Sequence, residues 1–182
     1  MSASRHSLSP LVITPANKLL RGLWSVAWLL LFRPTPRPFH AWRCMLLRLF
    51  GARLEPGVKV YESVRIWAPW NLEMKAGSCL GDDVNCYNVA RVTLHERAVV
   101  SQYSYLCTAS HDYTLRSHPL MVAPITLGAH AWVTADVFVG PGVVIGEGSV
   151  VAARSTVVRD VPPWMVVGGN PVQILKQREF KD

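Results

Sequence analysis

The stretch LGAHAWVTADVFVGPGVVIGEGSVVAARSTVVRDVP, residues 127–162, repeats with a strict period of six. Each of its six hexads opens on an aliphatic residue: Leu127, Val133, Val139, Ile145, Val151 and Val157. A helix repeats at 3.6 residues and an ordinary strand at 2, so neither explains this spacing. A period of six is typical of the parallel β-helix, in which each hexad forms one flat face of a coil.

Two further places in the hexad are small or β-branched. The second place holds Gly128, Thr134, Gly140, Gly146, Ala152 and Val158, and the fifth holds Ala131, Val137, Val143, Ser149, Ser155 and Val161. We expect the leading aliphatic side chain to point inward and to stack on its equivalent in the next coil. We expect the small residues at the second and fifth places to let the backbone turn the corner between faces.

The same register extends upstream with two slips. Leu54, Val60, Ile66 and Leu72 are six apart; a slip of two residues precedes Leu80 and Cys86, and a second slip precedes Leu94, Val100 and Leu106. The stretch CTASHDYTLRSHPLMVAP, residues 107–124, then breaks the hexads completely. We expect it to be an irregular loop extruded from a coil corner, and such loops inside compact repeats are usually functional.

These patterns predict an all-β fold, a parallel β-helix, within a single domain of 182 residues of which 50% are hydrophobic. Residues 1–53 form a basic, apolar, helical N-terminal segment. Residues 54–167 form the β-helix with its extruded loop 107–124, and residues 168–182 form a C-terminal tail.

All of the net charge of +7 belongs to the N-terminal part of the chain. Residues 1–54 contain no Asp or Glu and carry Arg5, Lys18, Arg21, Arg33, Arg37, Arg43, Arg48 and Arg53. Two apolar stretches, 18–32 and 39–51, read as helices, and the prolines of 33–38 force a turn between them. The uninterrupted apolar stretch of this segment, residues 22–32, is well short of the ~20 residues that a membrane crossing needs.

The tryptophans of this segment lie beside arginines, and two interpretations of them remain open. Trp24, Trp28 and Trp42 suit a helix that lies on an anionic membrane surface. Alternatively, the helices pack on the end of the β-helix or on a neighbouring subunit. A nucleic-acid partner is disfavoured, because the arginines alternate with a strongly aliphatic face and no nucleic-acid motif is present.

The four cysteines, Cys44, Cys79, Cys86 and Cys107, show neither a CxxC motif nor a metal-ligand spacing. Residues 1–16 lack the charged start, apolar core and cleavage site of a signal peptide. Both observations favour reduced thiols in a cytoplasmic protein.

Four features together resemble the hexapeptide-repeat acyltransferases: the hexads, TASHDY (108–113), IWAPWNLEM (66–74) and RDVPPWMVVGGNP (159–171). Within that family, the chain is most similar to the colanic-acid-type polysaccharide acetyltransferases and their nodulation and galactoside O-acetyltransferase relatives. The resemblance implies a left-handed β-helix and a homotrimer with acetyl-coenzyme A between adjacent prisms. It also implies O-acetylation of a sugar or glycan hydroxyl in cell-surface polysaccharide biosynthesis, in the cytoplasm or at the inner face of the cytoplasmic membrane.

His111 in the extruded loop matches the family's catalytic histidine. Transfer of an acyl group from a thioester to a hydroxyl needs a base, and an imidazole changes charge near neutral pH. Asp112 is a candidate to orient that imidazole or to contact the acceptor. The resemblance also assigns Asn85, Asn88 and Tyr103 to the acceptor side.

The resemblance assigns the cofactor side to Trp132, to the backbone near Ala135 and Ala153, and to Arg159 beside the coenzyme A phosphates. No metal is implied. Where galactoside-type enzymes have Ala-Pro-Asn, this chain has Ser101, Gln102 and Tyr103, so the acceptor sugar stays undefined.

The chemistry that we expect is direct transfer in a ternary complex. No GxSxG motif is present and Cys107 has no evident basic partner, which disfavours a covalent acyl-enzyme. Three alternatives remain: N-acetylation of an amino sugar, a non-catalytic β-helix scaffold, and a γ-class carbonic anhydrase. The last needs three histidines converging on zinc, and the spacing of the histidines in 95–130 does not provide them.

Overall fold

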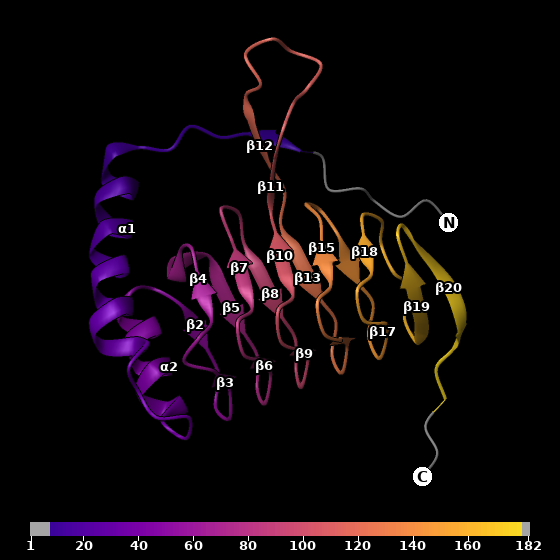
Figure 1. Ribbon diagram of the computed structural model, residues 1–182, viewed down its shortest axis with the longest axis horizontal. Helices are drawn as coiled ribbons and strands as arrows, with labels where there is room; N and C mark the ends of the chain where they lie inside the picture. The colour runs from indigo at the N-terminus through magenta and orange to yellow at the C-terminus, as the bar shows by residue number, and fades with distance from the viewer. Residues whose placement is uncertain (1–7, 180–182) are drawn as a thin grey trace.

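The computed structural model describes residues 8–179. Its main body is a parallel β-helix of triangular cross-section, whose three faces are parallel sheets joined at three corners (Figure 1). Face 1 consists of β2 (Arg53–Leu54), β5 (Leu72–Met74), β8 (Val92–Leu94), β13 (Ile125–Leu127) and β16 (Val144–Ile145). Face 2 contains β3 (Lys59–Val60), β6 (Cys79–Leu80), β9 (Val99–Val100), β14 (Trp132–Val133) and β17 (Val150–Val151). Face 3 consists of β4 (Arg65–Ile66), β7 (Asn85–Tyr87), β10 (Tyr105–Cys107), β15 (Phe138–Val139) and β18 (Thr156–Val157).

The hexad register predicted from the sequence is confirmed. Leu127 pairs with Ile145 on face 1, and the leading residue of every hexad from 127 to 157 has no exposed surface. The fifth-place residues also point inward and are buried. They fill the corners rather than turn them, so that part of the prediction was wrong.

The backbone turns at the fourth place of the hexad instead. His130, Asp136 and Arg154 occupy this place with φ between 56° and 59°, in the left-handed region. Small residues at the second place have a different reason, which is the close approach of the next coil. A Cβ on Gly128 would lie 2.5 Å from the backbone nitrogen of Glu147.

All three departures from the period fall at one corner, between faces 3 and 1. Met74, rather than Leu72, stacks on Leu54, so the first slip lies before β5, in the short 3-10 helix Pro69–Asn71. The second slip lies between β7 and β8, and residues 107–124 leave the same corner one coil later. This corner therefore differs in structure from the other two.

Residues 107–124 are not the irregular loop that we expected. They contain a β-hairpin of β11 (Ala109–His111) and β12 (Leu120–Val122), to which the N-terminal strand β1 (Ser9–Pro10) adds on the free side of β12. The amide of Leu11 continues the pairing by donating to the carbonyl of Leu120 at 3.0 Å. Figure 1 shows the hairpin rising from the body with β1 across its base.

The C-terminal residues also differ from the predicted tail. β19 (Met165–Gly169) pairs with β17 and continues face 2, and β20 (Val172–Gln177) folds back antiparallel to it. The turn between them contains a cis peptide bond, Asn170–Pro171. Residues 168–177 therefore cover the last coil of the β-helix (Figure 1).

The N-terminal segment forms α1 (Pro15–Ala27), which continues as a π-helical turn (Trp28–Phe32), and α2 (His40–Leu49). The hydroxyl of Thr14 caps α1 by accepting from the amide of Asn17. Helix α1 runs across one end of the β-helix, roughly perpendicular to its long axis (Figure 1). Among the helices of residues 8–179, none has both the length and the apolar character that crossing a membrane would require.

The tryptophans of α1 anchor the helix to the β-helix rather than face outward. The indole of Trp24 donates to the carbonyl of Ile66 at 2.7 Å and that of Trp28 to the carbonyl of Val64 at 2.8 Å. Trp24 is buried. This arrangement supports the packing interpretation for both residues and leaves Trp42 as the exposed tryptophan of the segment.

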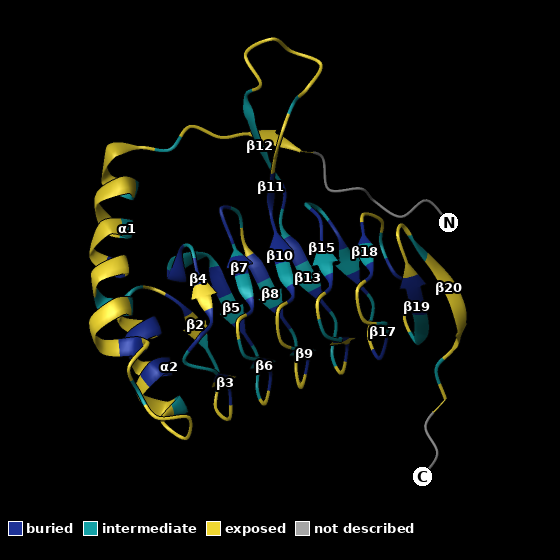
Figure 2. Cartoon of the chain, viewed as in Figure 1, coloured by how far each residue is buried: buried dark blue, intermediate teal, exposed yellow. Residues whose placement is uncertain are grey.

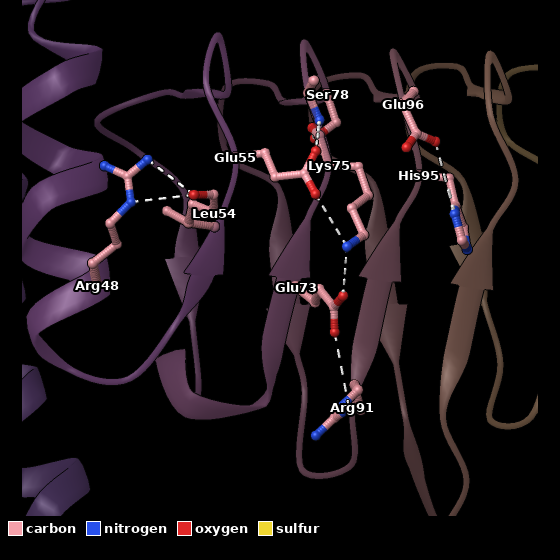
Figure 3. Close-up of polar contacts among 10 residues, drawn as sticks. Arg48, Leu54, Glu55, Glu73, Lys75, Ser78, Arg91, His95 and Glu96 are labelled. Atoms are coloured by element: carbon pink, nitrogen blue, oxygen red, sulfur yellow. Dashed lines mark hydrogen bonds and ion pairs between the residues drawn. The ribbon is translucent and has the colours of Figure 1, made fainter.

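The outer surfaces of the faces have different chemistry. Face 1 and its border carry an ion-pair chain in which Lys75 bridges Glu55 and Glu73, and Glu73 also approaches Arg91 (Figure 3). The hydrogen bond from Lys75 lowers the pKa of the Glu73 carboxyl. Face 3 instead carries a row of aromatic rings in edge contact, formed by Trp67, Tyr87, Tyr105 and Phe138. A charged face suits solvent, whereas an aromatic row suits a partner.

Candidate active site

His111 lies at the end of β11, on the exposed part of the hairpin. Its Nδ1 lies 2.6 Å from the main-chain carbonyl oxygen of His118. A carbonyl only accepts, so Nδ1 carries the proton in this contact and Nε2 presents a lone pair. The fixed tautomer is the one that a general base requires.

The orienting role of His118 was missed by the sequence analysis, which considered Asp112 for it. The Asp112 carboxylate instead accepts from the amide and the hydroxyl of Thr114, at 2.9 and 2.6 Å, and these bonds lower its pKa. This is a local turn within the hairpin. No signal in the sequence pointed to the contact between His111 and His118, because its acceptor is a main-chain carbonyl, which every residue carries.

The two predicted asparagines have different positions. Asn88 is fully buried, and its side-chain oxygen and nitrogen bond the amide and the carbonyl of Ala68 at 2.9 and 2.7 Å. It holds the corner between faces 3 and 1, so the structure contradicts its assignment to the acceptor. Asn85 points outward from face 3 and lines a groove beside α1.

Tyr103, Ala135 and Ala153 lie on a different edge, the corner between faces 2 and 3. The backbones of successive coils bond there: the amide of Asp136 donates to the carbonyl of Gln102, and the amide of Arg154 to that of Ala135. Tyr103 adopts a left-handed φ of 62° and is 63% exposed. The acceptor candidate Tyr103 thus shares an edge with the two cofactor candidates, one coil away from Ala135.

Trp132 and Arg159 complete the predicted set. Trp132 projects from face 2 with 44% of its surface exposed, and its indole donates to the hydroxyl of Ser101 at 2.9 Å. Arg159 is exposed at the corner between faces 3 and 1, the corner from which the hairpin leaves. A Trp held by a hydrogen bond offers a flat, fixed apolar surface to a ligand.

One chain does not bring all these residues together. The hairpin leaves the corner between faces 3 and 1, and in a triangular prism that corner is opposite face 2. His111 and Trp132 therefore lie on opposite sides of the β-helix, as the hairpin and the strands of face 2 do in Figure 1. A site that contains both needs residues from two copies of the chain.

The cysteine thiols are poor candidates for a nucleophile. Burial raises the pKa of Cys86 to about 12 and also raises the pKa of Cys44 and of Cys79. The Cys107 thiol is buried and donates to the carbonyl of Ala109. Across residues 8–179, no group of three or more His, Cys, Asp or Glu side chains is placed to hold a metal ion.

A parallel β-helix of stacked hexads with an extruded histidine hairpin defines a class, the hexapeptide-repeat transferases, and comparison with known proteins agrees. The chain is 41% identical over 162 residues to WcaF of Escherichia coli K12, whose name assigns it to colanic acid biosynthesis as an acetyltransferase; the match covers 89% of each chain. It is 32% identical over 94 residues to the galactoside O-acetyltransferase of that organism, covering 50% of this chain and 46% of the other. No family model matches the chain.

Solved structures give the same result. The hexapeptide-repeat acetyltransferase of Vibrio cholerae superposes with a TM-score of 0.82 at 26% identity, over 92% of this chain and 95% of the other. A structure of that acetyltransferase in complex with acetyl-coenzyme A superposes with a TM-score of 0.76 at 23% identity, over 92% and 91%. The chain belongs to the hexapeptide-repeat acetyltransferases, in the family that includes WcaF. It is therefore an acetyltransferase.

Proposed function

We propose that the chain transfers an acetyl group from acetyl-coenzyme A to a hydroxyl of a sugar or glycan, with His111 as the general base. The observation that carries this proposal is the contact between His111 Nδ1 and the His118 carbonyl at 2.6 Å. It fixes an exposed imidazole with Nε2 available for a proton. Kinship with WcaF supports a cell-surface polysaccharide as the acceptor.

In the proposed reaction, His111 Nε2 takes the proton of the acceptor hydroxyl as the hydroxyl oxygen attacks the thioester carbonyl. The carbon–sulfur bond of the tetrahedral intermediate then breaks, and the thiolate of coenzyme A takes up the proton from His111 Nε2 as it leaves, which restores the neutral imidazole. A backbone N–H at a coil corner is the candidate donor to the oxyanion. No covalent enzyme intermediate is needed.

The cofactor fits the edge between faces 2 and 3. The small side chains of Ala135 and Ala153 let a pantetheine arm approach the coil backbone, and Trp132 adds an apolar surface. Arg159 lies on the hairpin edge, so the Arg159 that suits the phosphates of coenzyme A would come from the neighbouring copy. The Vibrio cholerae acetyltransferase, solved with acetyl-coenzyme A, supports this donor.

A homotrimer brings these parts together. If the hairpin edge of one copy meets the edge between faces 2 and 3 of the next, then face 3 lies between the two contacts and points toward the threefold axis. Three rings of face 3, those of Tyr87, Tyr105 and Phe138, support this arrangement, because such rings are enriched at interfaces. His111 of one copy then meets Ala135 and Trp132 of its neighbour.

The activity is tested by incubating the purified protein with acetyl-coenzyme A and a panel of acceptors. Released thiol and the mass of each product are followed in parallel. The expected product is a glycan O-acetyl ester, which mild base cleaves under conditions that leave amides intact. Acetylation of amino sugars alone would replace O-transfer by N-transfer, and no transfer to any acceptor would contradict the enzymatic role of the site.

We also propose that the helical segment lies on the inner face of the cytoplasmic membrane. The outward side of α1 exposes Leu19, Leu23 and Val26, and its π-helical continuation exposes Leu30, each by more than half. Figure 2 shows this side of α1 as exposed. Since α1 crosses the end of the β-helix, a threefold axis parallel to the long axis of the β-helix would place three such helices in one plane, as a flat membrane requires.

Vesicle cosedimentation at two salt concentrations tests the membrane proposal. Leu23→Glu and Leu30→Glu are expected to abolish binding to anionic vesicles. The matched control is Leu175→Glu, since Leu175 is 61% exposed but lies on β20. Equal binding by all three variants and the wild type would contradict a membrane role for α1.

A further inference from the structure

An open groove of about 390 Å³ lies between helix α1 and face 3. Its lining includes Arg21, Trp24, Trp28, Arg65, Trp67 and Asn85. This is within the size range of small-molecule sites in proteins. The groove opens on face 3, the face that lies between the hairpin edge and the edge assigned to the cofactor.

The walls of the groove are fixed. The indoles of Trp24 and Trp28 bond the carbonyls of Ile66 and Val64, which holds α1 against face 3. The guanidinium of Arg21 lies 4.1 Å from the centre of the Trp67 ring, and its Nε donates to Asn17 at 3.2 Å. Arg21 is therefore held in place before any ligand arrives.

The charge of the groove is unbalanced. No acidic residue lines it. Within residues 8–179, the Arg65 guanidinium and the terminal nitrogens of Arg21 have no hydrogen-bond or ion-pair partner, whereas Arg37 pairs with Asp82 and Arg48 bonds the carbonyl of Leu54. Two arginines with unused donors are suited to a phosphate, which guanidinium groups bind in a bidentate manner.

We propose that this groove binds a phosphorylated sugar, with Arg21 and Arg65 on the phosphate or diphosphate. The indoles offer an apolar surface to the C–H side of a sugar ring, and the Asn85 amide can both donate to and accept from hydroxyls. The inference rests on the proposed function, for which it specifies the acceptor as a glycosyl phosphate. The groove lies on the inner side of α1, whose outer side exposes leucines.

Two sources share this chemistry, a soluble nucleotide sugar and a glycan linked through a diphosphate to a membrane lipid. Binding is measured on the full-length protein without acetyl-coenzyme A, so that the result does not depend on catalysis. The probes are uridine diphosphate glucose in solution and neutral phosphatidylcholine vesicles that contain a polyprenyl diphosphate. Tryptophan fluorescence reports the first and cosedimentation reports the second.

Arg65→Gln and Arg21→Gln are each expected to weaken binding by about tenfold or more, the loss of a charge-assisted contact. Arg65 is exposed, so its replacement leaves the fold intact. The matched control, Arg97→Gln, removes the same charge from an exposed coil corner on the border of face 2 and is expected to bind as the wild type does. Binding of one probe only identifies the source of the phosphate.

Two results would overturn the proposal. One is the absence of binding of either probe by the wild-type protein. The other is an equal loss of affinity in Arg65→Gln and Arg97→Gln, which would show that binding of the anion depends on the net charge of the protein rather than on the groove. Because acetyl transfer is measured separately, loss of this site would leave the role of His111 standing, and an inactive His111 would leave this site standing.

Discussion

At the scale of single residues, the β-helix depends on positions where a side chain has no room. A Cβ on Gly146 would lie 2.4 Å from the backbone nitrogen of Pro163 in the next coil. Backbone atoms inside a stack of coils cannot move away without disturbing the ladder on both sides. Glycine is thus a packing requirement at positions 128 and 146.

Gly146→Ala is therefore expected to destabilise the protein by about 1–3 kcal/mol, the usual cost of overpacking. The measurement is the free energy of unfolding in denaturant. Gly140→Ala is the matched control, since it occupies the same place in the hexad but its Cβ would meet nothing closer than 3.4 Å. Equal stability of the two variants would refute the packing argument.

The residues around His111 divide into those that touch the imidazole and those that shape the turn. Asp112 belongs to the second group, because its carboxylate is bonded to Thr114. We expect Asp112→Ala to lower kcat by less than about tenfold, well below the ~10²–10⁴ that a positioned base contributes. If its effect on kcat equalled that of His111→Ala, Asp112 would have to act on the imidazole directly.

At the scale of elements, the coils could be predicted and the hairpin could not. The stacking of Leu127 on Ile145 could be predicted, because each coil repeats the same inward position after 18 residues. This repeat is a local pattern in the sequence. The strand β1 pairs with β12 across more than a hundred residues, and no periodicity links Ser9 to Val122. Asn88 was misassigned for a related reason, since its partner Ala68 lies in the preceding coil.

The N-terminal strand is expected to hold the hairpin that carries His111. Leu11→Pro removes the amide that donates to the Leu120 carbonyl, a bond worth about 1 kcal/mol. Hydrogen exchange at residues 120–122 should accelerate and kcat should fall, while the unfolding midpoint stays close to that of the wild type. Val12→Pro is the control, because Val12 lies next to it and is 86% exposed. Identical exchange in both variants would show that β1 does not support the hairpin.

At the scale of the whole molecule, the proposal is that the active site is shared between copies. Light scattering should give a mass near 60 kDa, three times the 20.2 kDa of one chain. A sharper test mixes two inactive variants, His111→Ala and Ala153→Trp. The first lacks the base on the hairpin edge, and the second blocks the edge assigned to the cofactor. Random assortment into trimers should restore about a quarter of the sites. A mixture as inactive as its components would place the site within one chain.

The central claim is that His111 removes the proton of the acceptor hydroxyl. Its side chain lies on the exposed hairpin, outside the buried hexads, so its loss opens no cavity in the core. The most direct measurement is therefore the kcat of His111→Ala together with its affinity for acetyl-coenzyme A. We predict that kcat falls by ~10²–10⁴, or roughly 3–5 kcal/mol of barrier, while that affinity and the oligomeric state are unchanged. A variant that keeps more than about a third of the wild-type kcat would contradict the account, since a positioned base contributes far more than that.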